Sequence, residues 1–246
     1  MITVQSLERE NINGGLDVKL GDYPYHVHVE IQHSTTNTIA DCNGAILDDV
    51  HVVTAAHCIT NDKGILYDPM TIKVEAGTIY LKDEPLYRGF VKGIYLPAEF
   101  YRDHRIAHAD IAVLKLDTSI NFESSNGTID RIKLAERNKT YEGSEADFTG
   151  FGYNDVKHIE KPDGTFRIEG SSNERLHHGE TLILSEDDCL HSISSKTVLN
   201  FDDQFCARMK QHSGDVYRGA CRGDSGGPLV VSDFGAKKKI LSFALR

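Results

Sequence analysis

No run of apolar residues in this sequence approaches the roughly 18 consecutive positions that a membrane-spanning helix needs. Positive charge is also scarce, because 27 lysines and arginines stand against 37 aspartates and glutamates, a formal net charge of -10. A chain with this balance is not expected to bind nucleic acid or an anionic membrane surface. Apolar residues make up 39% of the chain, which is typical of a globular protein with a real core.

The sequence also has few cysteines and no metal-binding pattern. Cysteine occurs 5 times, so at least one thiol has no partner within the chain, and the sequence alone does not fix which cysteines pair. None lies close enough to another to match the spacing of a zinc site. We therefore expect no metal and no cofactor. Residues 1–10 are polar and lack the apolar segment of a secretory signal.

Helical periodicity is scarce, whereas short runs rich in Val, Ile and Leu recur between clusters of Gly, Asn, Asp and Pro. Such runs predict strands, and many short strands favour an antiparallel sandwich or barrel. Short helical turns are predicted at residues 55–59 and 185–191, the second with Ser185 as its N-cap. Examples of these predicted strands are residues 27–31, 44–47, 50–54, 111–116, 181–184, 228–231 and 240–243.

Polar segments divide this pattern of strands. Residues 154–175 and 210–218 are polar, contain glycine, and predict long surface loops. A boundary between two halves is predicted at residues 118–130, where Ser, Asn and Gly cluster after a strand.

Three separated segments carry the side chains that a serine hydroxyl needs to hydrolyse an amide, namely a base, an acid that orients it, and a nucleophile beside N–H donors. His57 follows a strand-like run and two alanines, directly before Cys58. Asp110 directly precedes the apolar run 111–116. A lone histidine would favour a core histidine beside a disulfide, but the residues around His57 favour a catalytic role. An aspartate in the position of Asp110 is often only a cap or turn residue.

The third segment, residues 221–229, reads Cys-Arg-Gly-Asp-Ser-Gly-Gly-Pro-Leu. Glycines on both sides of Ser225 let the backbone turn tightly, so that the N–H groups of Gly223 and Ser225 could converge on one oxyanion. A turn between strands is the ordinary interpretation of such a composition. However, the string 223–228 arises by chance on the order of once in 10⁵ chains of this length. We predict that His57, Asp110 and Ser225 are catalytic.

These motifs resemble those of the chymotrypsin-like, trypsin-fold serine endopeptidases, and the resemblance runs from residue 12 to the last residue. Residues 12–15, Ile-Asn-Gly-Gly, resemble the amino terminus that precursors of this family expose on cleavage. Residues 149–152 resemble a family signature that usually has tryptophan in place of Phe151. Residues 242–243 resemble the strand that faces a bound substrate.

The resemblance implies an all-β fold of two perpendicular, six-stranded antiparallel barrels with the active site between them. Residues 1–11 would be a propeptide-like segment, residues 12–122 the first barrel and residues 131–246 the second. The chain ends before the cysteine that pairs with Cys221 in the family. We therefore expect the second barrel to lack its carboxy-terminal strand and helix.

The same resemblance assigns the remaining residues of the site. It implies disulfides Cys42–Cys58 and Cys189–Cys206, which fit an extracellular or secretory compartment. Cleavage after Asn11 would free the amine of Ile12 to pair with Asp224 and set the oxyanion hole of Gly223 and Ser225. The substrate pocket would have a neutral floor that favours apolar or small side chains over Lys or Arg, and would be formed by Gly219, Ala220, Arg222, Ser242, Phe243 and Ala244.

Three functions remain open from the sequence. The first is a secreted serine endopeptidase, made as a proenzyme, with polypeptide substrates and protein protease inhibitors as partners. The second is a non-catalytic homologue that acts as a binding or regulatory module, which the unusual Asn11 and Asn13 and the early end of the chain favour. The third is a lipase-like hydrolase of another fold, which the strands predicted on both sides of Ser225 argue against.

Overall fold

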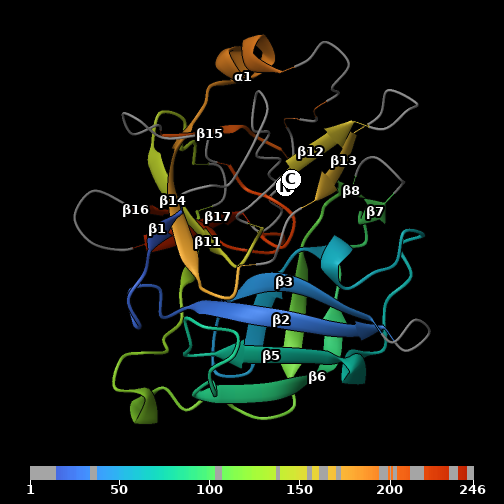
Figure 1. Cartoon of the computed structure of the whole chain (residues 1–246), viewed down its shortest axis with the longest axis vertical. Coiled ribbons are helices and arrows are strands. Elements are labelled where there is room, and N and C mark those ends of the chain that lie inside the picture. Colours follow the sequence, from blue (N-terminus) through green and yellow to red (C-terminus); the bar gives the residue numbers. More distant parts are fainter. Residues whose placement is uncertain are drawn as a thin grey trace.

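Strands dominate the computed structural model, and they form two units that Figure 1 shows one above the other. The first unit contains strands from residues 26 to 116, and the second contains β1 and strands from residue 133 onward. The structure describes residues 15–33, 38–102, 107–136, 139–153, 157–160, 166–169, 173–193, 199, 201, 204–210, 219–232 and 238–242.

The first unit is a closed antiparallel barrel of six strands, which confirms the prediction for this half of the chain. Its strands are short and rich in β-branched residues, which pack well on a pleated surface. In order around the barrel they are β2 (His26–His33), β3 (Thr38–Ile46), β4 (His51–Thr54), β9 (Ala112–Leu116), β6 (Tyr87–Tyr95) and β5 (Ile72–Ala76).

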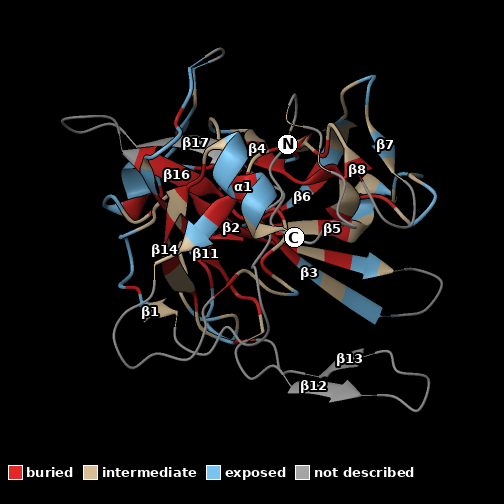
Figure 2. Ribbon diagram, turned by 90° about the horizontal axis from the view of Figure 1, so that it is seen from above, coloured by how far each residue is buried: buried red, intermediate tan, exposed pale blue. Residues whose placement is uncertain are grey.

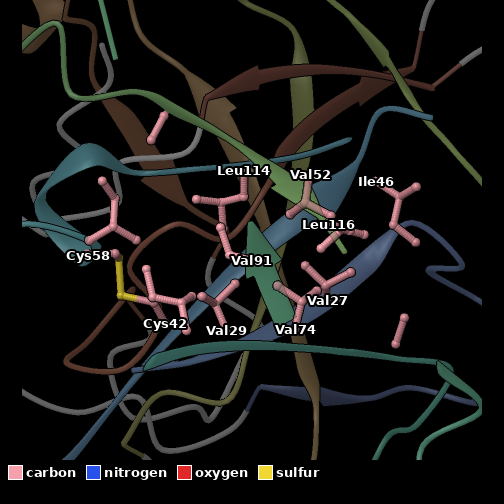
Figure 3. Close-up of a cluster of buried hydrophobic side chains, with 14 of the residues drawn as sticks. Val27, Val29, Cys42, Ile46, Val52, Cys58, Val74, Val91, Leu114 and Leu116 are labelled. Atoms are coloured by element: carbon pink, nitrogen blue, oxygen red, sulfur yellow. A yellow bond between two sulfur atoms is a disulfide. The ribbon is translucent and has the colours of Figure 1, made fainter. Parts of the chain in front are cut away.

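Aliphatic side chains fill the interior of this barrel (Figure 3). Side chains alternate between the two faces of a strand, so Val27, Val29 and Ile31 of β2 point inward and have no solvent exposure. On the outer face of the same strand, His26 and His28 are also buried, because that face packs against the second unit. One side of the first barrel is therefore an interface rather than free surface.

The second unit is a sheet of seven strands in the described residues. All its pairings are antiparallel except that of β10 with β17, which is parallel and differs from the expected antiparallel pattern. Phe148, Ile183 and Leu229 belong to its core. The order is β1 (Leu16–Asp17), β14 (His177–Ile183), β11 (Glu145–Gly150), β16 (Leu229–Ser232), β17 (Lys238–Ser242) and β10 (Lys133–Leu134), with β15 (Ala207–Met209) beside β14.

The helices of the described residues are short, and none of them is long and apolar enough to cross a membrane. Both predicted helical turns are present as η1 (Ala56–Cys58) and α1 (Glu186–Ser192), and the hydroxyl of Ser185 accepts the first-turn N–H of Asp188 at 3.0 Å. Helix α1 presents an exposed face (Figure 2). The remaining helical turns are η2 (Pro69–Thr71) and η3 (Glu123–Ser125), the latter within the predicted boundary.

Two small hairpins lie outside the main sheets. β7 (Tyr101–Arg102) pairs with β8 (Ala107–His108) directly before Asp110. β12 (Lys157–Glu160) pairs with β13 (Phe166–Glu169) inside residues 154–175. The prediction of a long loop there missed this hairpin, because strands of mainly polar sequence lack the apolar runs on which strand prediction depends.

Both disulfides implied by the family resemblance are present. Cys42 of β3 is bonded to Cys58 of η1, and Cys189 of α1 is bonded to Cys206 just before β15. Cys221 is free, which accounts for the odd number of cysteines. The first bond ties the turn that carries His57 to the barrel wall (Figure 3).

We predict that Leu114→Ala lowers the free energy of unfolding by about 2–5 kcal/mol, the range for removing a buried leucine side chain and leaving a cavity. Leu114 has no solvent exposure and lies in the core of the first barrel. Urea unfolding followed by tyrosine fluorescence and circular dichroism measures the change. Leu190→Ala, at a position on α1 that is 54% exposed, is the matched control. Equal losses in the two variants would contradict the assigned core.

Candidate active site

His57 and Asp110 meet at the rim of the first barrel. The carboxylate of Asp110 accepts two hydrogen bonds from His57, one from the backbone N–H at 2.7 Å and one from ring Nδ1 at 2.6 Å. Its side chain has 0% exposure, whereas 14% of the His57 side chain is exposed. Because a carboxylate only accepts hydrogen bonds, Nδ1 carries a proton, and in the neutral form of the ring the free lone pair is on Nε2.

The backbone around each partner explains this geometry. Ala109 has a φ of 47°, a left-handed conformation uncommon for a residue with a Cβ, and its carbonyl accepts the N–H of Ile111 at 2.8 Å. This tight turn comes between β8 and β9 and directs Asp110 toward η1. Residues held in such conformations concentrate at functional sites, where the surrounding structure supports the strain.

Arg102 holds the other side of the turn that carries His57. Its Nη1 donates to the carbonyl oxygens of His57 and Thr60, each at 2.9 Å, and its Nη2 pairs with Asp62 at 3.0 Å. The guanidinium group has a fixed planar fork of donors, which suits several acceptors at once. Three restraints therefore act on this turn: the disulfide of Cys58, the carboxylate of Asp110 and the guanidinium of Arg102.

The serine loop is a series of tight turns. Gly223 and Gly226 have φ values of 96° and 78°, in the region that favours glycine. Asp224 N–H donates to Cys221, and Gly227 N–H donates to Asp224, both at 3.0 Å. Within the described part of the chain, the N–H groups of Gly223 and Ser225 donate no hydrogen bond. They are thus unused donors on either side of the Asp224 backbone.

Asn43 joins the serine loop to the first barrel. Its backbone N–H donates to the carbonyl of Ser225 at 2.7 Å, and it directly follows Cys42, whose disulfide partner Cys58 directly follows His57. Ser225 and His57 are therefore linked through one hydrogen bond and one disulfide. Among the described residues no hydrogen bond joins their side chains; His57 Nε2 lies 3.9 Å from Cys58 Sγ.

Asp224 is a buried carboxylate with only 3% exposure. Its oxygens accept the N–H groups of Gly152 and Cys221, both at 2.8 Å, and within the described residues no cation pairs with it. Burial raises its pKa to about 6 against the opposing effect of these two hydrogen bonds. A Cβ at Gly150 or Gly152 would overlap this carboxylate, which gives a physical reason for the glycines of residues 149–152.

Two buried histidines of β2 flank the ring of Phe151, with ring centroids at 5.6 Å and 5.7 Å. Burial and the nearby charge of His28 lower the pKa of His26 to about 3, and His26 Nδ1 lies 2.8 Å from the hydroxyl of Thr149. Burial acts in the same direction on His28, but Asp41 at 3.0 Å and Glu75 at 3.5 Å outweigh it, so the pKa of His28 is raised. The pKa values of two neighbouring histidines on one strand are therefore shifted in opposite directions.

The other predicted site residues are described unequally. Gly219 is buried, Ala220 packs against the core of the second unit, and Arg222 is exposed with its carbonyl accepting Tyr153 N–H at 2.9 Å. Ser242 is the last residue of β17, opposite Leu229, and only its backbone is described. Ile12, Phe243 and Ala244 lie outside the described residues. Within the described chain no three His, Cys, Asp or Glu side chains gather as metal ligands would.

Sequence reasoning missed Asn43 and Arg102. Asn43 follows a cysteine and Arg102 lies near a hairpin, and neither position matches a motif. Their partners are backbone carbonyls more than thirty positions away in the sequence, as the bonds from Asn43 to Gly223 and from Arg102 to His57 illustrate. Only the folded arrangement identifies them.

This fold, with a closed barrel and a second sheet meeting at a His–Asp pair and a glycine-rich serine loop, defines a chymotrypsin-like architecture. The sequence profile named Trypsin matches residues 12–236. The chain therefore belongs to the trypsin family of serine proteases.

Individual relatives are similar at a moderate level. The chain is 27% identical to coagulation factor XI of Bos taurus, over 90% of this chain and 31% of that protein. It is 26% identical to trypsin-1 of Astacus astacus, over 92% of this chain and 84% of that protein. It is also 26% identical to trypsin eta of Drosophila erecta, over 90% of this chain and 76% of that protein.

We predict that the burial of Asp224 makes unfolding stability depend on pH. A carboxyl whose folded pKa is raised favours the protonated state, so its contribution is full below its ordinary pKa of 3.8 and is lost as pH rises through about 6. Relative to Asp224→Asn, which does not titrate, the wild type should lose about 2 kcal/mol between pH 4 and pH 7. Chemical unfolding at both pH values measures this difference.

Asp130→Asn, at an exposed position, controls for the loss of one negative charge from an acidic chain. If the difference in free energy of unfolding between the wild type and Asp224→Asn stayed constant from pH 4 to pH 7, a raised pKa at Asp224 would be contradicted.

Proposed function

We propose that this protein is a serine endopeptidase that hydrolyses peptide bonds through an acyl-enzyme and is made as a proenzyme. The observation that carries the proposal is the paired hydrogen bond of a fully buried Asp110 to the backbone and ring of His57. This arrangement fixes the tautomer and the orientation that a general base beside a serine requires.

In the proposed reaction, Ser225 Oγ attacks the carbonyl carbon of the substrate while His57 Nε2 takes the hydroxyl proton. The imidazolium that forms is stabilised by Asp110, which keeps its hydrogen bond from Nδ1. His57 then gives the proton to the leaving amine, and the C–N bond breaks to leave an acyl group on Ser225. Water, activated by the same histidine, releases the acid and restores the hydroxyl.

The negative oxygen of the tetrahedral intermediate needs donors that are already in place. Gly223 and Ser225 supply two backbone N–H groups with no hydrogen-bond acceptor in the described structure. Donors fixed before the reaction need no reorganisation when charge develops, so they stabilise the transition state more than the substrate. The contribution of these two donors to the rate depends on how rigidly the backbone of the serine loop is held.

The buried carboxylate of Asp224 supports the proposal of a proenzyme. An acid at 3% exposure without a cation is costly, and the positive amine of Ile12, freed by cleavage after Asn11, would compensate it. Asp224 lies between the two proposed oxyanion donors in sequence, so a new ion pair there would act directly on their backbone. The two disulfides favour a secreted protein, with polypeptides as substrates and protein protease inhibitors as partners.

We predict that an organophosphorus probe labels the wild-type chain once, and that Ser225→Ala abolishes labelling without loss of stability. The fold should persist because the hydrogen bond of Ser225 to the barrel uses its backbone carbonyl. Labelling is measured by mass spectrometry on the full chain and on a form that begins at Ile12, with faster labelling expected for the second. Mass mapping identifies the modified residue.

The matched control is Ser124→Ala, at an exposed serine of η3, which should label as the wild type does. Labelling of Ser225→Ala would overturn the nucleophile, and absence of labelling in both forms of the wild type would favour the non-catalytic homologue.

We predict that cleavage follows apolar or small side chains, with Lys and Arg disfavoured at least about 100-fold in kcat/KM, because a neutral pocket floor leaves a buried cation unpaired. Gly219 and Ala220 carry no charge and are buried or half-buried. A peptide library gives the preference, and Gly219→Asp, which adds a carboxylate, should shift it toward Lys and Arg. A Lys or Arg preference in the unsubstituted protein would contradict the assigned floor.

A further inference from the structure

Asn43 of β3 is fully buried at 0% exposure and makes contacts with both units. Its side-chain Nδ2 donates to the carbonyl of Gly223 at 2.7 Å, and its backbone N–H donates to the carbonyl of Ser225 at 2.7 Å. Its own carbonyl accepts the hydroxyl of Thr54 at 2.6 Å. One residue of the first barrel thus holds the serine loop at two points.

The two carbonyls that Asn43 holds belong to the residues whose N–H groups are the proposed oxyanion donors. Within a residue, N–H and C=O are joined through only two soft torsions, so fixing the carbonyl restricts the direction of the N–H. The restriction matters most at Gly223, because a glycine with a φ of 96° has no Cβ to limit its backbone. At Ser225 the backbone N–H of Asn43 supplies the restraint, and at Gly223 only the side-chain amide does so.

The backbone of the serine loop at Gly226 lies directly against Asn43 and leaves no room for a side chain there. A Cβ on Gly226 would overlap the carbonyl of Asn43 and the hydroxyl of Thr54. The hydroxyl of Thr54 also donates to the carbonyl of Asn43, so Asn43, Thr54 and Gly226 are packed together at the interface between the units.

Not every buried polar atom of the Asn43 side chain has a hydrogen-bond partner. Its Oδ1 and Nε2 of His26 are both buried without a hydrogen-bond partner. Leaving a buried polar atom unpaired is unfavourable, but an apolar side chain here would remove the donor that the carbonyl of Gly223 uses. The amide is explained by what its Nδ2 does, which is to hold Gly223.

We propose that Asn43 is a positioning residue for the oxyanion hole, with its amide N–H holding Gly223 in the orientation that binds the tetrahedral intermediate. This inference rests on the proposed function. Because the interaction acts on donors used in the transition state, its loss lowers kcat and leaves KM nearly unchanged. We expect Asn43→Ala to lower kcat about 10-fold or more and to change KM less than about 3-fold.

A pair of inhibitors distinguishes a loss of oxyanion-hole positioning from a general disturbance of the active site. A peptide aldehyde forms a hemiacetal with Ser225 and places an oxyanion among the donors, whereas the corresponding peptide alcohol binds without forming a bond. In Asn43→Ala, aldehyde affinity should fall by the same factor as kcat/KM, while alcohol affinity should stay within about 2-fold of wild type. A merely structural role would weaken both ligands together and would overturn the inference.

Asn43→Ser tests the same point with a polar atom retained in the buried site, and serves if Asn43→Ala does not fold. Asn121→Ala, at an exposed asparagine outside the site, is the matched control and should behave as wild type. Wild-type kcat and aldehyde affinity in folded Asn43→Ala or Asn43→Ser would overturn the inference alone. Failure of the wild type to label with the organophosphorus probe would overturn the proposed function, and this inference with it.

Discussion

The hydrogen bond from the N–H of Asn43 to the carbonyl of Ser225 is the contact on which the candidate site depends. The two units carry different parts of the chemistry, so a site forms only if they meet in a fixed register. The bond lies one residue from Cys42, and the disulfide to Cys58 carries the restraint to the turn of His57. Buried hydrogen bonds are strong restraints because no water competes for the donor or the acceptor.

The two buried aspartates of the candidate site differ in the partners of their carboxylates. Asp110 has an ordered histidine beside it and accepts two hydrogen bonds from it. Asp224 accepts two backbone N–H groups but has no cation among the described residues, and burial raises its pKa to about 6. The carboxylate of Asp110 is already hydrogen-bonded to the proposed base, whereas the burial of the Asp224 carboxylate lowers the stability of the folded chain. This contrast supports the proposal of a proenzyme, in which the His57–Asp110 pair is already formed and Asp224 would gain a cation on cleavage.

Much of this arrangement could be predicted from the sequence, because the chemistry depends on short strings. His57, Asp110 and Ser225 stand in motifs with restrictive neighbours, and residues 221–229 contain the glycines that the turns require. Four strands of the first barrel, β2, β3, β4 and β9, overlap the apolar runs named from the sequence. The sequences of β5 and β6 interleave apolar with charged residues, and these two strands were not named. By contrast, the pairing of β12 with β13 depends on backbone hydrogen bonds between polar strands, which leave no hydrophobic pattern.

What the sequence does not reveal is contact across the interface. Asn43 and Arg102 act on carbonyl oxygens, and every residue has a carbonyl, so no sequence pattern identifies the acceptor. From the sequence, Gly150 and Gly152 were identified only as part of the family signature at residues 149–152. Their reason, room for the carboxylate of Asp224, depends on a loop more than seventy residues later in the chain.

The two histidines of β2 show how the interface between the two units accommodates buried titratable rings. Asp41 of β3 and Glu75 of β5, from the strands on either side of β2, favour the charged form of His28. His26, two positions earlier and next to Asn43, has its pKa lowered to about 3 and is neutral. His28 lies opposite Asn43 in the pairing of β2 with β3, so the carboxylates of Asp41 and Glu75 compensate positive charge close to the serine loop. Asn43 itself binds the carbonyls of Gly223 and Ser225 through neutral N–H donors, so the serine loop is held to the first barrel by neutral hydrogen bonds.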